Sequence, residues 1–140
     1  MNASEFSMDL FKKTARAAAA EGCVLLRNEH GALPLEKDCR VAVFGRTQMN
    51  DFKSGLGSGG LVNARYVVGI YQALNECLPT DDTLRKAYET WTEEHPFDRG
   101  DGWGSHPWYQ QEMPLSEEMV VQCAARNDAA VVIIGRTAGE

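Results

Sequence analysis

The sequence has 140 residues, a length that fits one domain with a real hydrophobic core. Its apolar fraction of 44% and charged fraction of 24% are those of a globular protein and exclude a disordered chain. The net charge of −6, with 14 scattered basic residues, argues against a nucleic-acid partner, because phosphate binding needs concentrated Lys and Arg.

No stretch approaches the roughly 20 apolar residues that span a bilayer, so no membrane partner is expected. The first ten residues lack the basic start and apolar run of a signal peptide, which predicts a cytoplasmic protein. The four cysteines lie far apart without a C-x-x-C pair, so the sequence predicts neither a metal site nor a cofactor.

In chain order, residues 7–21 are predicted to form a helix, since Ser7 can cap it and its alanines favour helix. Gly22 ends this helix, and the apolar run around Val24 is a possible strand. Residues 40–45 form an apolar run of strand length. Such runs are typical of a parallel sheet that helices cover on both faces.

Three further helices follow from the pattern of apolar residues. Residues 67–78 have helical spacing, residues 84–91 continue it with Asp82 as a possible cap, and Ser116 can cap a third helix. Residues 93–114 have no usable period and are predicted to be an ordered surface excursion. Residues 129–135 are a second buried strand.

This order of elements predicts an α/β fold, a three-layer sandwich with a mainly parallel sheet. Only two strands are clear, whereas a typical sheet has about five or six. We therefore expect an incomplete, truncated sheet in a chain cut off at Glu140. Its last strand would leave an unpaired edge at residues 130–135, through which the chain could self-associate.

A glycine-rich loop is the first candidate site. Residues 55–60 fit the letters G-x-G-x-x-G, but a dinucleotide fingerprint must turn directly from a strand into a helix. Here the loop starts well after Gly45, so nucleotide binding is the weakest interpretation. A loop around Ser58 that shapes a polar substrate pocket, or a loop without a ligand, remain open.

The ends of the two strands form the second candidate site. Both continue as Gly-Arg-Thr, which includes Arg46 in one case and Arg136 in the other. If the strands are parallel, both segments emerge at the edge where α/β proteins bind ligands, with Glu140 just beyond. The alternative is that both arginines are solvated loop residues and Glu140 is a surface acid.

Several segments together resemble glycoside hydrolase family 3. Residues 15–29, A-R-A-A-A-A-E-G-C-V-L-L-R-N-E, followed by A-L-P-L, are similar to the opening of that family's (α/β)6-sandwich domain. Residues 40–45 and 53–60 are similar to its next strand and Gly/Ser-rich loop. Residues 130–140, ending G-R-T-A-G-E, resemble the strand that leads into its Gly-Glu active-site loop. The resemblance is poor over residues 79–111.

The resemblance implies a β-glucosidase-type enzyme that removes terminal non-reducing β-glucosyl residues with retention, which requires two carboxyl groups. It implies that Glu140 is the candidate general acid/base and that the nucleophile lies on a barrel domain absent here. Arg46, Ser58 and Arg136 are then candidate substrate-binding residues.

Residues 1–140 would be a partial sandwich domain from a member with reversed domain order, inactive alone and binding carbohydrate only together with the missing barrel. The alternative function is a small α/β ligand-binding module that uses the Gly-rich loop and is not an enzyme.

Overall fold

The computed structural model describes residues 7–51, 63–98 and 110–135. The chain divides into two compact units, Met1–Leu35 and Glu36–Glu140.

The first unit is built around helix α1 (Met8–Glu21), followed by the 3-10 turn η1 (Glu29–Gly31). As predicted, the Ser7 hydroxyl accepts a hydrogen bond from the Leu10 N–H, at 3.3 Å, and the helix ends at Gly22. The possible strand around Val24 is absent. The residues around Val24 have no regular secondary structure, and Val24 is 77% exposed. An apolar run becomes a strand only where a neighbouring strand can pair with it.

The second unit contains a parallel sheet. Strand β1 (Val41–Phe44) pairs with strand β2 (Ala129–Val132), in a register that places Val41 opposite Ala129 and Phe44 opposite Val132. At the other edge of β1, Val41 forms a single parallel bridge with Thr80. Both predicted strands are therefore confirmed. Within the described ranges, the third place in the sheet is held by this bridge alone.

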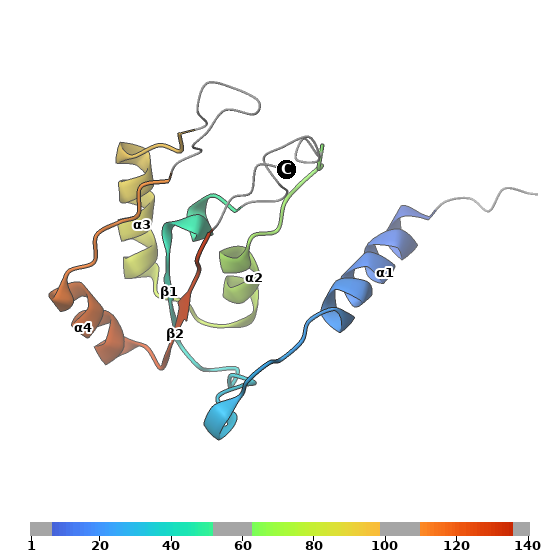
Figure 1. Ribbon diagram of the computed structural model, residues 1–140, viewed down its shortest axis with the longest axis horizontal. Helices are drawn as coiled ribbons and strands as arrows, with labels where there is room; N and C mark the ends of the chain where they lie inside the picture. Colours follow the sequence, from blue (N-terminus) through green and yellow to red (C-terminus); the bar gives the residue numbers. More distant parts are fainter. Residues whose placement is uncertain (1–6, 52–62, 99–109, 136–140) are drawn as a thin grey trace, which may run out of the picture. The chain divides into compact units, whose positions relative to one another are not determined.

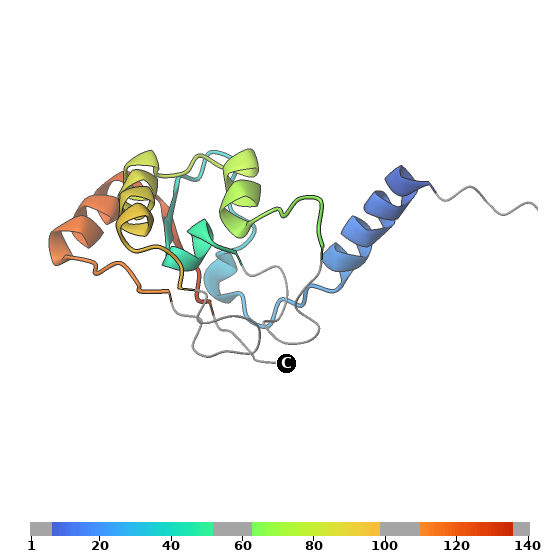
Figure 2. The same ribbon diagram turned by 90° about the horizontal axis from the view of Figure 1, so that it is seen from above.

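Helices lie on both sides of the two strands. Helix α2 (Ile70–Cys77) lies on one side, and helices α3 (Asp82–Glu94) and α4 (Glu117–Arg126) lie on the other (Figure 1, Figure 2). A short 3-10 helix, η2 (Arg46–Met49), follows β1 after Gly45. The predicted α/β arrangement, with a parallel sheet between helical layers, is confirmed.

The core lies between the strands and the α3–α4 side. Ala42 packs there with Leu84 and Tyr88 of α3, and with Met113 and Cys123. The residues Val41–Val43 of β1 are buried, whereas Val132 of β2 is 65% exposed and Ile134 beyond it is 81% exposed. The β2 side of the sheet is thus left partly uncovered by the described residues.

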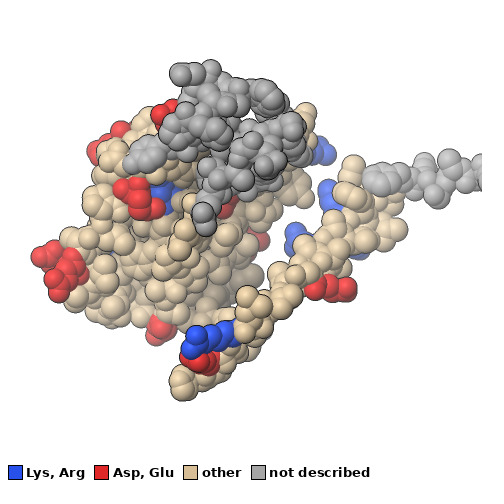
Figure 3. All heavy atoms as spheres, viewed as in Figure 1, with Lys and Arg blue, Asp and Glu red and all other residues tan. Residues whose placement is uncertain are grey.

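On the face of the second unit that Figure 3 shows, the basic side chains of the described residues do not gather into a patch. On the face in Figure 3, acidic side chains are spread over the α3 and α4 side of the second unit, and the basic ones do not form a stripe. Among the residues that the structure describes, no helix is both long and apolar enough to cross a bilayer.

The residues that cap the helices show that one capping prediction was wrong. Ser116 caps α4 as predicted, since its hydroxyl accepts the Met119 N–H at 3.2 Å. Asp82, however, does not cap α3. Its neighbour Asp81 does so, with Oδ1 accepting the N–H groups of Thr83 at 3.0 Å and Leu84 at 3.1 Å. Asp82 is already the first helical residue and is exposed.

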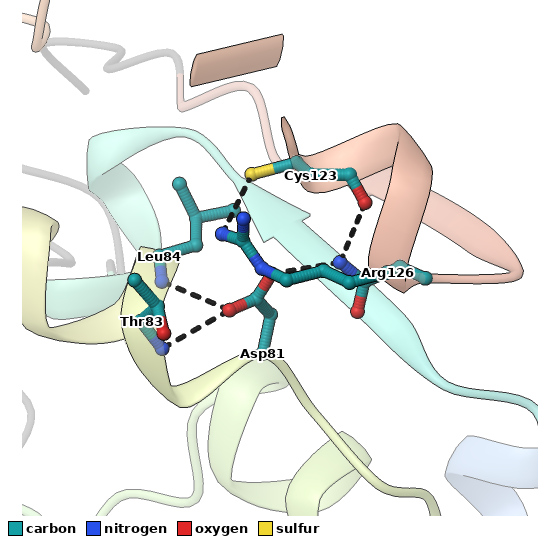
Figure 4. Close-up of polar contacts among 6 residues, drawn as sticks. Asp81, Thr83, Leu84, Cys123 and Arg126 are labelled. Atoms are coloured by element: carbon teal, nitrogen blue, oxygen red, sulfur yellow. Dashed lines mark hydrogen bonds and ion pairs between the residues drawn. The ribbon is translucent and has the colours of Figure 1, made fainter. Parts of the chain in front are cut away.

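Asp81 also joins α3 to the end of α4 (Figure 4). Its Oδ2 accepts hydrogen bonds from Arg126 Nε, at 2.6 Å, and from Asn127 Nδ2, at 2.7 Å. Asp81 is only 3% exposed, and both of its carboxylate oxygens accept hydrogen bonds from groups of the protein. One buried carboxylate therefore fixes the helical layer that covers the sheet.

The Asp81 pKa makes this contribution pH-dependent. Burial raises the pKa, but hydrogen bonds from Asn127, the Leu84 N–H and Arg126 outweigh it and leave the pKa below 3.8. A carboxyl group with a lower pKa in the folded state stabilises the fold above its unfolded pKa, and this stability is lost as the pH falls through the folded value. We expect the unfolding free-energy difference between wild type and Asp81→Asn, from urea titrations, to shrink below about pH 3.8. An equal difference at about pH 6 and about pH 3 would contradict this.

Candidate functional site

The carboxyl ends of β1 and β2 emerge side by side, as the parallel register requires. Ile133 donates its N–H to the Phe44 carbonyl at 2.8 Å. A Cβ atom on Gly45 would lie 2.0 Å from the Ile133 carbonyl oxygen, and one on Gly135 would lie 2.2 Å from Thr47 Oγ1. The two segments that begin Gly-Arg-Thr in the sequence therefore start at one edge of the sheet. This confirms the expectation for their starting points, while Arg136 itself lies outside the described residues.

Gly45 is required for this close approach. Its φ of 103° is one that side chains disfavour, and the backbone oxygen of Ile133 leaves no room for a Cβ atom. We expect Gly45→Ala to lower the free energy of unfolding by about 3 kcal/mol in urea titrations. The energetic cost of a positive φ for alanine and the cost of the clash with the Ile133 backbone add together.

Gly31→Ala is the matched control for this prediction. Gly31 has a positive φ of 66° but nothing within 4 Å of its Cβ position, so only the strain of about 1 kcal/mol should remain. Equal losses in the two variants would contradict the role of the Gly45–Ile133 approach.

Arg46 follows β1 after Gly45 and is 1% exposed. Its Nη1 donates to the Gln111 carbonyl at 2.9 Å, and its Nη2 donates to the His95 carbonyl. Its backbone N–H is shared by the two carboxylate oxygens of Glu112, at 3.1 and 2.9 Å. The alternative of a solvated loop residue is therefore wrong for Arg46. The role of Arg46 in substrate binding stays a prediction.

Tyr88 and Glu112 complete this arrangement. The Gly45 N–H donates to the Tyr88 hydroxyl at 2.8 Å, and the Glu112 carboxylate lies close enough for its charge to act on that hydroxyl. Burial raises the pKa of Tyr88, and the negative charge of Glu112 raises it further. We call Arg46, Tyr88 and Glu112, with the carbonyls of His95 and Gln111, the strand-end clamp.

Sequence reasoning missed most of the strand-end clamp. Tyr88 was expected only as part of the apolar face of a helix, which says nothing of its hydroxyl group. Glu112 lies in a stretch without a usable period, and the two carbonyl acceptors carry no sequence signal. The remaining signal was the position of Arg46 directly after a buried strand.

A pocket of about 560 Å³ opens beyond the strand ends. Thr47 and Asp51 line it after β1, residues 133–135 line it after β2, and Tyr66 and Ile70 line it near the start of α2. Asp51 Oδ1 also accepts the Ile70 N–H, at 3.4 Å. A hydroxyl and a carboxylate beside apolar walls are suited to a small polar ligand.

The other predicted site residues, Ser58, Arg136 and Glu140, lie outside the described residues. Among residues 7–51, 63–98 and 110–135, no group of His, Cys, Asp or Glu side chains is arranged to hold a metal ion.

Parallel strands between helical layers, with polar groups and a pocket at their carboxyl ends, define an α/β domain of the class whose members bind ligands at this edge of the sheet. Residues 23–140 match the model of the glycosyl hydrolase family 3 C-terminal domain. The chain belongs to this family.

Known relatives agree with this assignment. A β-glucosidase of Ruminococcus albus is 47% identical over 131 residues, which are 93% of this chain and 14% of the relative. The structure of a β-glucosidase from Paenibacillus barengoltzii matches 96% of this chain and 15% of its own, with 47% identity and a TM-score of 0.86. β-Glucosidase 3B of Thermotoga neapolitana, in complex with α-D-glucose, matches 97% of this chain and 19% of its own, with 34% identity and a TM-score of 0.78. The chain thus spans about 14% of the length of the curated relatives.

Proposed function

We propose that this chain is part of a longer retaining β-glucosidase that hydrolyses terminal non-reducing β-glucosyl residues. The observation that carries the proposal is the 47% identity to a β-glucosidase across 93% of the chain. The pocket beyond the ends of β1 and β2 supports it, since it offers polar groups at the edge where α/β domains bind ligands.

In this proposal the chain supplies one side of the sugar site, and a separate barrel domain supplies the nucleophile. Retention needs two carboxyl groups about 5 to 5.5 Å apart, one as nucleophile and one as general acid/base. Glu140 is the proposed acid/base, and Ser58 and Arg136 are proposed to contact the sugar. The nearby nucleophile and burial by the barrel would raise the pKa of Glu140, so that it could protonate the leaving oxygen.

Two further features of the proposal concern the chain by itself. Residues 129–135 carry no charge and no proline, and Val132 and Ile134 are exposed, so the outer edge of β2 lacks the usual protection against pairing with a second copy. Self-association through this edge and a cytoplasmic location are both part of the proposal.

The proposal is tested by assaying an aryl β-glucoside with the longer protein and with the purified 140-residue chain in parallel. We expect hydrolysis by the longer protein and none by the chain, because the chain holds only one of the two carboxyl groups. Hydrolysis by the chain, with host contaminants excluded, would contradict the division of the site. A longer protein that binds glucosides without cleaving them would favour the ligand-binding module instead.

A further inference from the structure

We infer that Arg46 is a positioning residue of the sugar site. It fixes the end of β1 against the two ends of the stretch from His95 to Gln111 and acts through them, without touching the substrate. This inference rests on the proposed function for its consequence in catalysis, whereas the contacts that support it belong to the chain itself.

The Arg46 side chain binds two segments that are distant in sequence. Its guanidinium reaches the carbonyl of His95, just beyond the end of α3, and the carbonyl of Gln111, which precedes α4. A guanidinium presents several donors in a fixed plane, so it can hold two acceptors at a set distance. A lysine ammonium is a point charge on a flexible stem and cannot impose the same spacing.

Both acceptors are themselves held in place by α3. The Gln111 carbonyl also accepts a hydrogen bond from Trp91 Nε1, at 3.0 Å. The rings of Trp91 and His95 stack with centroids 3.6 Å apart, and the His95 N–H donates to the Trp91 carbonyl at 2.9 Å. Arg46 thus links the strand end to acceptors that are already fixed relative to the helix.

The orientation of Arg46 separates positioning from direct contact. Its neighbour Thr47 lines the pocket beyond the strand ends, whereas the guanidinium binds backbone carbonyls and is buried. The backbone N–H of the same residue binds the Glu112 carboxylate, so residue 46 is held at both its main chain and its side chain. Loss of the Arg46 side chain should therefore change the distance between the end of β1 and the carbonyls of His95 and Gln111. It should not remove a direct contact to the sugar.

Hydrogen exchange of the 140-residue chain tests the positioning contact directly. In Arg46→Met, we expect amide exchange at His95, Phe97 and Asp98 and at residues 110–113 to rise about tenfold, while exchange in β1 stays within about twofold. Arg46→Lys should show a smaller rise at the same residues. Arg85→Met is the control, because Arg85 forms an (i, i+4) pair with Glu89 outside the clamp, and it should leave these amides unchanged. Unchanged exchange in Arg46→Met, or a uniform rise along the chain in both Arg46 variants, would overturn the inference.

Kinetics of the longer protein test the consequence for the substrate. Arg46→Met should raise KM for an aryl β-glucoside about tenfold with kcat within about threefold, because the change affects how the site receives the sugar in ground and transition states alike. Arg46→Lys should raise KM less than Arg46→Met does. A fall in kcat at unchanged KM would overturn the inference. If the wild-type longer protein hydrolyses no glucoside, the proposed function fails, and hydrogen exchange still decides whether Arg46 holds the clamp.

Discussion

Replacing Glu140 by alanine in the longer protein should lower kcat for a β-glucoside with a poor leaving group by about a thousandfold. Without a general acid, the departing alkoxide or phenoxide must leave unprotonated, which is costly when its conjugate acid is weak. A dinitrophenyl glucoside should lose far less in the glycosylation step, because dinitrophenolate needs little protonation to depart. Pre-steady-state kinetics with the two substrates measure the difference.

The control for this prediction is Glu118→Gln, which changes an exposed acid in the first turn of α4 and should leave kcat unchanged. Equal losses for good and poor leaving groups would indicate that Glu140 has another role. Full activity of the Glu140→Ala variant would place the acid/base elsewhere in the protein.

Replacing Asp81 by alanine should lower the free energy of unfolding of the chain by about 3 kcal/mol. The change removes the cap of α3 and leaves Arg126 and Asn127 without their buried acceptor. The loss combines the helix cap with hydrogen bonds to a charged carboxylate, which contribute more than neutral ones. Urea titration at neutral pH measures the loss.

Asp82→Ala is the matched control for Asp81. It removes an adjacent acid from the same helix turn, but Asp82 is exposed, so we expect a loss of no more than about 0.5 kcal/mol. Similar losses for Asp81 and Asp82 would contradict the view that buried hydrogen bonds, and not helix-dipole charge, carry the effect.

The layers of the fold could be predicted because each element has its own signal. The run from Val41 to Phe44 is apolar on both faces, which predicts a strand buried between helices, and Ser7 and Ser116 are caps whose hydroxyls bind where expected. These features depend on residues close in sequence, so the printed order of residues is enough to find them.

The errors have a common physical cause, since they depend on partners distant in sequence. Asp81 and Asp82 are equivalent as local caps, and only the proximity of Arg126 and Asn127 selects Asp81. The run around Val24 has strand composition but no partner strand among the described residues.

The strand-end clamp illustrates the same limit at the candidate site. The Gly-Arg-Thr pattern predicted that Arg46 lies at the carboxyl end of a strand, but the sequence did not indicate that its guanidinium binds the His95 and Gln111 carbonyls. Backbone acceptors have no signature in a side-chain pattern. The position of Arg46 was thus predictable, and its partners were not.

We propose that this chain carries the acid/base of a retaining β-glucosidase whose nucleophile lies elsewhere in a longer protein. This proposal is tested most directly by incubating the Glu140→Ala variant of the longer protein with a dinitrophenyl β-glucoside and azide. Azide needs no general base, so it should intercept the glucosyl-enzyme intermediate, speed turnover and give β-glucosyl azide. The α-anomer of the product, or no acceleration by azide, would contradict the claim.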